Sequence, residues 1–188
     1  SWTVVGEGVE YRKFHLTSPR PIDLFVTRMN RSNLEVTIDT AIAQGRLSGG
    51  TETVPNMVIR YDQAINYWDK TWGNRNQIVV AINGYYFNTS TGVPMGGQIH
   101  SGWYAKRYEN YNGDAGFAWD LERNAFIGDC VYHTASKQKI SFQNSDYMPN
   151  LQAVNLLRST QELILYTPQY DASTLTTSTS ENPILEIL

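Results

Sequence analysis

Two glycine-rich segments hold the residues of this chain that are best suited to contact a ligand. They are Ile82-Asn-Gly-Tyr-Tyr-Phe87 and Val93-Pro-Met-Gly-Gly-Gln-Ile-His100, the second followed by Ser101-Gly102. Glycine permits tight turns and close backbone approach to a ligand, and free backbone N–H groups bind anions. An asparagine at the end of a strand, such as Asn83, can fix a sugar hydroxyl or a phosphate oxygen. A plain β-hairpin explains the same composition, so the pattern alone leaves both interpretations open.

The three histidines, His15, His100 and His133, lie far apart in the sequence and form no zincin-like pair. The spacing therefore argues against a histidine-based metal site. His15 alternates with core-like residues and is expected on the surface of a strand, whereas His100 follows a glycine-rich loop and is the more interesting. Cys130 lies in an apolar stretch, where an inert buried thiol is expected. We predict no cofactor; Asp and Asn are numerous enough for a loop-bound Ca²⁺, but no EF-hand-like spacing indicates one.

A third segment of interest is Asn155-Leu-Leu-Arg158, just before Leu163-Ile-Leu-Tyr-Thr-Pro168. The planar guanidinium of arginine can bind two oxygens of a phosphate or carboxylate at once. A lone arginine is also common in surface salt bridges, and the sequence does not decide between these roles.

Composition excludes several classes of protein. The chain has 188 residues, a net charge of −3 and one cysteine, which suits a single domain without an intrachain disulfide or a cysteine-based metal cluster. The net negative charge argues against a nucleic-acid partner, and no apolar run is long enough for a membrane span. Charged residues make up only 18%, while 12 Tyr and 5 Trp are present. That balance is common both in carbohydrate-handling proteins and in β-rich domains.

Hydrophobic periodicity predicts an α+β fold. Alternation of period two predicts strands over 9–14, 22–27 and 34–38, and the turn at 29–33 predicts a hairpin between the last two. From Val54 apolar residues recur at helical spacing, and Thr53-Val-Pro55 suits a helix start, so a helix is predicted over about 54–70. The run Ile78-Val-Val-Ala-Ile82 predicts a strand buried on both faces. Further short strands are predicted over 117–119, 125–132, 139–142 and 162–167. The expected architecture is one largely antiparallel, mixed sheet or set of sheets with one main helix packed on it.

Several segments match a known pattern when they are taken together and in chain order. They are Gly8-Val-Glu-Tyr-Arg-Lys-Phe14, Thr51-Glu-Thr-Val54 with Met57 and Ile59-Arg-Tyr61, Ala81-Ile-Asn-Gly-Tyr-Tyr-Phe87, Pro94-Met-Gly96 with Gly102, Asn155-Leu-Leu-Arg158, and Leu165-Tyr-Thr-Pro168. With this ordered set, which covers nearly the whole chain, the sequence resembles the phosphodiester glycosidase domain family. The resemblance implies hydrolysis of a sugar-1-phosphodiester, for example a GlcNAc-1-phosphodiester, to free sugar and a phosphomonoester. It also implies a secreted or cell-surface protein whose partner is a carbohydrate or glycan phosphodiester.

The resemblance assigns roles to particular residues. Glu52 becomes the candidate catalytic carboxylate, although an acid there also suits the dipole at the start of a helix. His100 becomes a candidate proton carrier. The candidates for substrate binding are Asn83, Gly84, Tyr85, Tyr86, Gly96, Gly97, Asn155 and Arg158, with Arg158 on the departing phosphate and a tyrosine stacked on the sugar.

Two departures from the family pattern shape the alternatives. Tyr85 stands where the family has Gly or Asp, and no Gly-rich D-G-G-G-S-S segment follows Pro168. We therefore expect a single domain, over 1–188, that is truncated at its C-terminal end, with the missing segment or a partner chain completing the sheet. The apolar run Ile184 to Leu188 agrees with that expectation. The alternative function is a non-catalytic carbohydrate-binding or surface-interaction module of the same fold.

Overall fold

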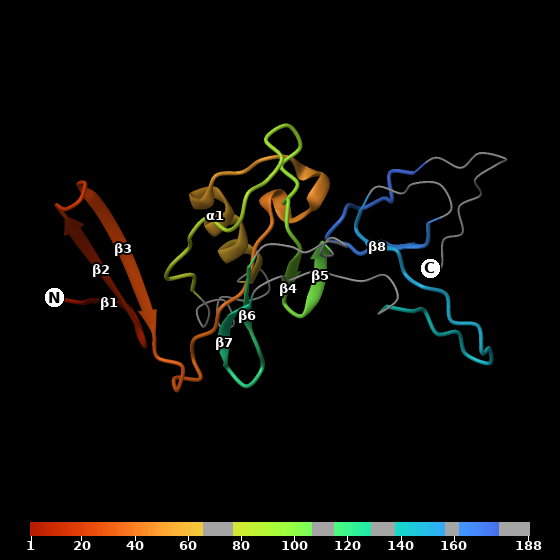
Figure 1. Ribbon diagram of the computed structural model, residues 1–188, viewed down its shortest axis with the longest axis horizontal. Helices are drawn as coiled ribbons and strands as arrows, with labels where there is room; N and C mark the ends of the chain where they lie inside the picture. The colour runs from red at the N-terminus through yellow and green to blue at the C-terminus, as the bar shows by residue number, and fades with distance from the viewer. Residues whose placement is uncertain (66–76, 107–114, 129–137, 157–161, 177–188) are drawn as a thin grey trace.

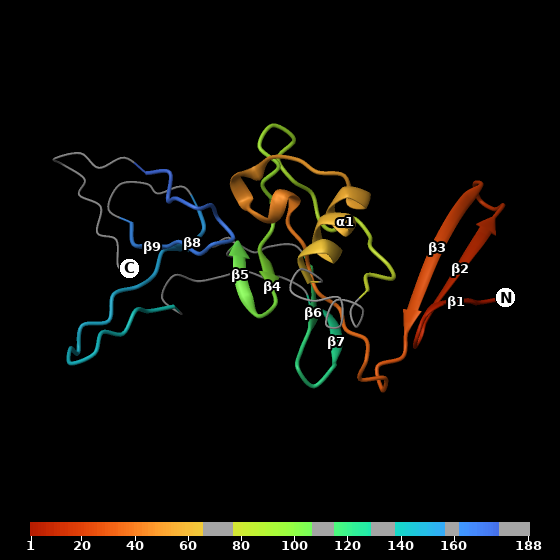
Figure 2. The same ribbon diagram turned by 180° about the vertical axis from the view of Figure 1, so that it is seen from behind.

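The computed structural model describes residues 1–65, 77–106, 115–128, 138–156 and 162–176. Its elements follow one another along the long axis of the molecule (Figure 1). A three-stranded sheet lies at the N-terminal end, the helix and two strand pairs lie in the middle, and the last strand pair lies beyond them. The reverse view gives the same arrangement (Figure 2). The fold class is α+β, with several small, mostly antiparallel sheets and one main helix.

The N-terminal sheet consists of β1 (Thr3–Gly6), β2 (Val9–Leu16) and β3 (Ile22–Met29) in the order β1-β2-β3. β2 and β3 form a regular antiparallel hairpin in which Val9 faces Met29 and Leu16 faces Ile22. The connecting turn contains a cis peptide bond between Ser18 and Pro19. The predicted strands over 9–14 and 22–27 are thus confirmed, but they pair with each other.

The predicted hairpin between 22–27 and 34–38 is wrong, because 34–38 forms no strand. Leu34 is 79% exposed. The guanidinium of Arg123 donates hydrogen bonds to the carbonyl oxygens of Arg31, Asn33 and Val36, at 2.6–2.7 Å. Carbonyls held by this side chain are not available for a strand ladder, which needs them for its own hydrogen bonds.

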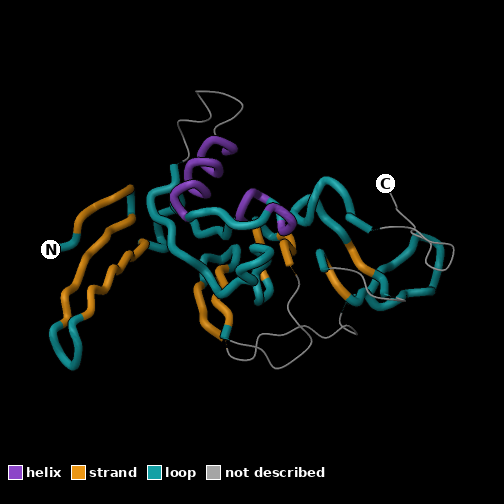
Figure 3. Tube along the Cα trace, turned by 90° about the horizontal axis from the view of Figure 1, so that it is seen from above, coloured by secondary structure: helices purple, strands orange, loops and turns teal. Residues whose placement is uncertain are grey.

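The helix α1 (Val54–Ile65) begins where the capping residue and proline predicted it. Two short 3₁₀ turns precede it, η1 (Ala43–Gly45) and η2 (Leu47–Gly49). The rest of the predicted helix, from 66 to 70, lies outside the described residues. Viewed from above, α1 and the 3₁₀ turns, drawn in purple, lie beside the short strands in the middle of the molecule (Figure 3).

The predicted central strand over 78–82 is not present. The segment has no strand hydrogen bonding, and Ile82 is 83% exposed. Val79 packs against Gly6 of β1, where a methyl group built on the glycine would lie 2.7 Å from Val79 Cγ1. A continuous apolar run forms a doubly buried strand only when neighbouring strands flank it, and no described strand pairs with this one.

Three strand pairs complete the fold. β4 (Gln98–His100) pairs with β5 (Trp103–Lys106), and β6 (Gly116–Trp119) pairs with β7 (Ala125–Gly128), both antiparallel. The pair β8 (Ala153–Val154) and β9 (Ile164–Leu165) is parallel. The prediction over 117–119 is confirmed by β6, which begins one residue earlier, and the prediction over 162–167 is confirmed as a shorter strand. The prediction over 125–132 is confirmed as far as 128, and its remainder lies outside the described residues. The segment 139–142 contributes only an isolated bridge, between Lys139 and Asn150.

The central core is small. Ile42, Leu47, Ala105 and Tyr170 are buried together, and Tyr166 packs against them. These residues come from the segment before α1, from β5 and from the chain after β9, so the core joins parts of the sequence that lie far apart. Ile42 also ends the segment that leads from Asp39 into η1, where the candidate site is found.

Candidate functional site

The irregular segment from Asp39 to Ile42 forms hydrogen bonds with side chains of both β4 and α1. Three consecutive carbonyl oxygens of the segment contact these side chains. Thr40 O contacts His100 Nδ1, Ala41 O accepts from Gln98 Nε2 at 3.0 Å, and Ile42 O accepts from Arg60 at 2.7 Å. This segment therefore connects both ends of β4, Gln98 and His100, to Arg60 of α1.

The Asp39 carboxylate is the centre of a dense hydrogen-bond cluster. Its Oδ1 accepts the N–H of Thr40 at 2.8 Å and that of Ser101 at 2.9 Å. Its Oδ2 accepts the hydroxyl of Ser101 and that of Tyr61, the latter at 3.3 Å. Burial raises the pKa of the Asp39 carboxyl, but the bonds from His100, Ser101 and Thr40 outweigh it and hold that pKa well below its usual range. The carboxylate therefore stays ionised.

The imidazole of His100 is held on one side by this cluster. Nδ1 contacts the carbonyl oxygen of Thr40 and lies 3.5 Å from Oδ1 of Asp39. The ring of Tyr61 meets it edge-on, with 5.7 Å between centroids. The interaction with Asp39 raises the pKa of His100 above its ordinary value, against burial, which lowers it. The side chain is 21% exposed, and Nε2 has no bonding partner among the residues that the structure describes.

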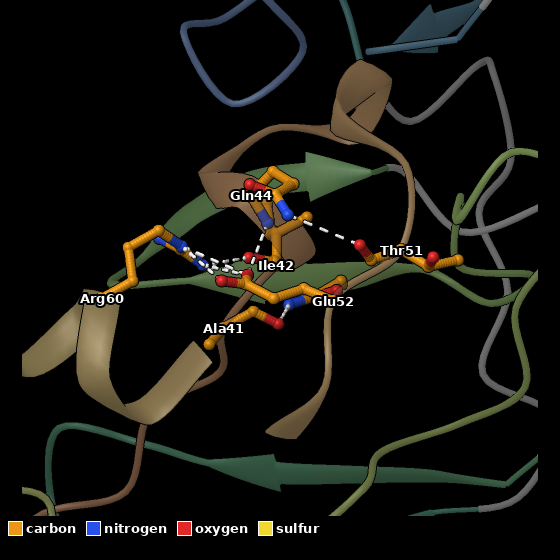
Figure 4. Close-up of polar contacts among 7 residues, drawn as sticks. Ala41, Ile42, Gln44, Thr51, Glu52 and Arg60 are labelled. Atoms are coloured by element: carbon orange, nitrogen blue, oxygen red, sulfur yellow. Dashed lines mark hydrogen bonds and ion pairs between the residues drawn. The ribbon is translucent and has the colours of Figure 1, made fainter. Parts of the chain in front are cut away.

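Glu52, the predicted catalytic carboxylate, is tied to Arg60 (Figure 4). The guanidinium donates to both carboxylate oxygens at 3.0–3.2 Å, and the N–H of Gln44 donates to Oε2 at 2.7 Å. The Glu52 side chain is only 6% exposed. Burial raises the pKa of this carboxyl, but the bonds from Arg60 and Gln44 lower it below its usual value overall. Both carboxylate oxygens are thus engaged by Arg60 or Gln44, and these contacts favour a structural role for Glu52.

The predicted stacking residues lie on an exposed hairpin. The segment from Tyr86 to Met95 folds back on itself through a bridge between Phe87 and Pro94 and a hydrogen bond from Met95 N–H to Tyr86 O at 2.9 Å. Tyr85 and Tyr86 are 52% and 74% exposed, and their rings meet edge-on with centroids 5.4 Å apart. This turn, closed by a single bridge outside the strands, presents two aromatic rings to solvent.

Tyr85 packs against Gly96, which precedes His100 by four positions in the chain. A methyl group built on Gly96 would lie 3.3 Å from Cδ1 of Tyr85, so the ring lies against this glycine. Gly96 and His100 are four positions apart, a span of at most ~14 Å. Gly97 lies between them and is half-buried, whereas Asn83 and Gly84 are exposed at the start of the hairpin. The structure thus packs Tyr85 against Gly96 and Tyr86, while the described contacts of His100 are with Thr40, Asp39 and Tyr61.

Asn155 lies apart from solvent, at 1% exposure. Its Nδ2 contacts the carbonyl oxygens of Tyr104 and Ala105 and Oγ1 of Thr167, at 2.7–3.2 Å, and its Oδ1 accepts Thr167 N–H at 2.8 Å. With its amide fully engaged, Asn155 connects β5 to the end of β9 and does not face a ligand. Arg158, the predicted phosphate ligand, lies outside the described residues.

Sequence reasoning missed Asp39, Tyr61 and Ser101 as site residues. Asp39 lies 61 residues before His100, and no local spacing links the two. The helical spacing of apolar residues assigned Tyr61 to the buried face of the helix, which gave no indication of a role in the site. Ser101 offered a weak signal, since it directly follows His100 in the glycine-rich segment.

Comparison with known proteins identified no relative: no family model, curated protein or solved structure matches this chain. The family assignment therefore stays a prediction that rests on the motifs. In the described parts of the chain, no three His, Cys, Asp or Glu side chains gather in a way that could hold a metal ion. None of the described helices is long and apolar enough to cross a membrane.

We expect Glu52→Gln to lower the free energy of unfolding at neutral pH by about 1.5–3 kcal/mol, the range for hydrogen bonds to a charged group. The folded-state pKa of Glu52 is depressed, so its stabilisation is present above the ordinary value of 4.5 and is lost as the pH falls below it. The difference between wild type and variant, measured by urea denaturation, should therefore shrink in acid.

The matched control is Glu10→Gln, which removes the carboxylate of the Glu10–Arg28 pair in the exposed sheet. Both side chains of that pair are at least 34% exposed, so the loss should stay below ~1 kcal/mol. Equal losses in the two variants would contradict a structural role for the Glu52–Arg60 pair.

Proposed function

We propose that this protein hydrolyses a sugar-1-phosphodiester to free sugar and a phosphomonoester. One observation carries the proposal: the His100 imidazole is anchored through Nδ1 by a carboxylate and a carbonyl, while its other nitrogen has no described partner. Such a histidine can exchange a proton with a substrate near neutral pH. The ordered motif set, which resembles the phosphodiester glycosidase family, supplies the class of substrate.

In the proposed reaction, the oxygen of a water molecule bonds to the anomeric carbon of the sugar. The bond between that carbon and the phosphodiester oxygen breaks, and its electron pair stays on the phosphate. Protonated His100 gives its Nε2 proton to the departing oxygen. The water loses one proton as it bonds to the carbon, and this proton passes through solvent to Nε2, so that His100 is protonated again. Phosphate is a good leaving group, so the acid contributes toward the lower end of the usual ~10²–10⁴-fold range.

The surroundings of His100 suit a negatively charged sugar ester. A protonated imidazole beside the ionised Asp39 remains a cation at its outer edge, where a phosphate can approach. The exposed rings of Tyr85 and Tyr86 offer flat apolar faces for a sugar. The backbone N–H groups of Gly96 and Gly97 are suited to phosphate oxygens, and Arg158 is assigned to the phosphate by the motif match alone.

The test is release of sugar from GlcNAc-1-phosphodiester and from other sugar-1-phosphodiesters by the full chain. We expect His100→Gln to reduce kcat by about 10²-fold, and Arg158→Ala to raise KM through the lost phosphate contact. His15→Gln alters the exposed histidine of β2 and should leave the rate unchanged. If the wild-type chain releases no sugar from any such substrate, the proposed function is wrong.

A second function is favoured by a different observation. The carboxylate that the motif match assigns to catalysis is bound by Arg60, while Tyr85 and Tyr86 remain open to solvent. A surface with exposed aromatic rings and a candidate carboxylate already engaged suits a non-catalytic carbohydrate-binding module.

Substitution of Tyr86 distinguishes the two functions. For a binding module, Tyr86→Ala should weaken glycan affinity about two- to tenfold, as the ~0.5–1.5 kcal/mol typical of an aromatic contact implies. No form of the protein should then release sugar. Calorimetric titration with the glycan measures the affinity. An enzyme would instead show a raised KM for the phosphodiester, and phosphate-free glycan would bind only weakly.

A further inference from the structure

We propose that Asp39 is the positioning residue of His100, and that the pair leaves Nε2 as the nitrogen that exchanges a proton with substrate. The inference rests on the proposed function for its catalytic meaning, but its structural content is independent of activity. It concerns a residue that lies 61 positions before the histidine and belongs to none of the family motifs.

The geometry around Nδ1 determines which nitrogen carries the proton in the neutral ring. Nδ1 contacts Thr40 O and lies 3.5 Å from Oδ1 of Asp39, and both oxygens are acceptors. A carbonyl can only accept a hydrogen bond, and an ionised carboxylate likewise only accepts. Nδ1 must therefore keep its hydrogen, which leaves the lone pair of the neutral ring on Nε2.

Asp39 is itself held in place by donors from three elements. The N–H and hydroxyl of Ser101 come from the turn after β4, the N–H of Thr40 from the irregular segment, and the hydroxyl of Tyr61 from α1. Because four donors hold the carboxylate, it cannot turn away from the ring without losing several bonds. This preorganisation is what a positioning residue requires.

The charged groups near His100 are few among the described residues. Tyr61, on α1, has a raised pKa, through burial and the neighbouring Asp39, and therefore stays neutral. Arg60 is adjacent on the same helix, but its guanidinium is bound to Glu52 and to the carbonyl of Ile42. Asp39 is thus the charge that acts directly on the imidazole.

The chain contains a second Asp–His pair that serves as a matched control. His15 Nδ1 lies 2.8 Å from Oδ1 of Asp23 on the exposed face of β2 and β3, and the two side chains are 61% and 40% exposed. Lys13 also pairs with Asp23, at 2.7 Å. The same Asp→Asn substitution can therefore be made in the half-buried Asp39–His100 pair and in the exposed Asp23–His15 pair.

The test is a ¹⁵N NMR titration of the histidines in wild type, Asp39→Asn and Asp23→Asn. In the wild type, neutral His100 should be the Nδ1–H tautomer. Asp39→Asn should lower the pKa of His100, whereas Asp23→Asn should not affect the titration of His100. On a sugar-1-phosphodiester, Asp39→Asn should reduce kcat about tenfold or more with little change in KM.

Each result bears on the proposal. It is overturned if wild-type His100 is the Nε2–H tautomer, a measurement that needs no variant, or if the pKa of His100 is the same in Asp39→Asn. Should Asp39→Asn fail to fold, Ser101→Ala removes one donor to the carboxylate and should shift the same titration in a smaller degree. A chain that shows the expected tautomer and shift but releases no sugar supports the positioning role and refutes the proposed function.

Discussion

The polar backbone of the segment from Asp39 to Ile42 is the constraint on which the centre of this structure depends. The segment belongs to no helix or strand, so no ladder supplies donors to its carbonyl oxygens, yet it runs into the buried core at Ile42. A carbonyl buried without a partner would be costly, which applies here to Ile42, while Thr40 and Ala41 are exposed. Side chains of β4 and α1 supply the hydrogen bonds, through His100, Gln98 and Arg60. These hydrogen bonds to the carbonyl oxygens of one segment therefore hold α1 and β4 in place relative to each other.

The same constraint explains how the candidate site is built. Arg60 and Tyr61 are neighbours on α1, and they contact opposite ends of the segment. Arg60 donates to the carbonyl of Ile42 and pairs with Glu52. Tyr61 donates to Asp39 and packs edge-on against His100. The Glu52–Arg60 pair then supports the helix, while the Asp39 cluster supports the histidine. The Glu52 carboxylate is bound by a guanidinium and therefore contributes to the stability of the fold. His100 is bound through Nδ1, so its Nε2 can exchange a proton with a substrate. We infer that the two acids divide these tasks.

Local patterns predicted the local features of the fold and missed the long-range ones. Thr53-Val-Pro55 predicted the start of α1, and alternation predicted β2 and β3, because those signals lie within each segment. The predicted hairpin is wrong because Arg123, about 90 residues away, binds the carbonyls of residues 31–36. The predicted strand over 78–82 is absent because no described strand pairs with it. In the site, His100 was predicted from its glycine-rich setting. Asp39 was not, because only the folded chain brings it to the ring.

The most direct test of the central claim is the pH dependence of sugar release from a sugar-1-phosphodiester. If protonated His100 delivers the proton, kcat should fall as the pH rises through a pKa above the ordinary 6.5 of histidine, because Asp39 raises that pKa. The residual activity of His100→Gln should lack this fall. A wild-type profile that is flat across neutral pH, or one that His100→Gln reproduces, would contradict the claim that this histidine takes part in the reaction.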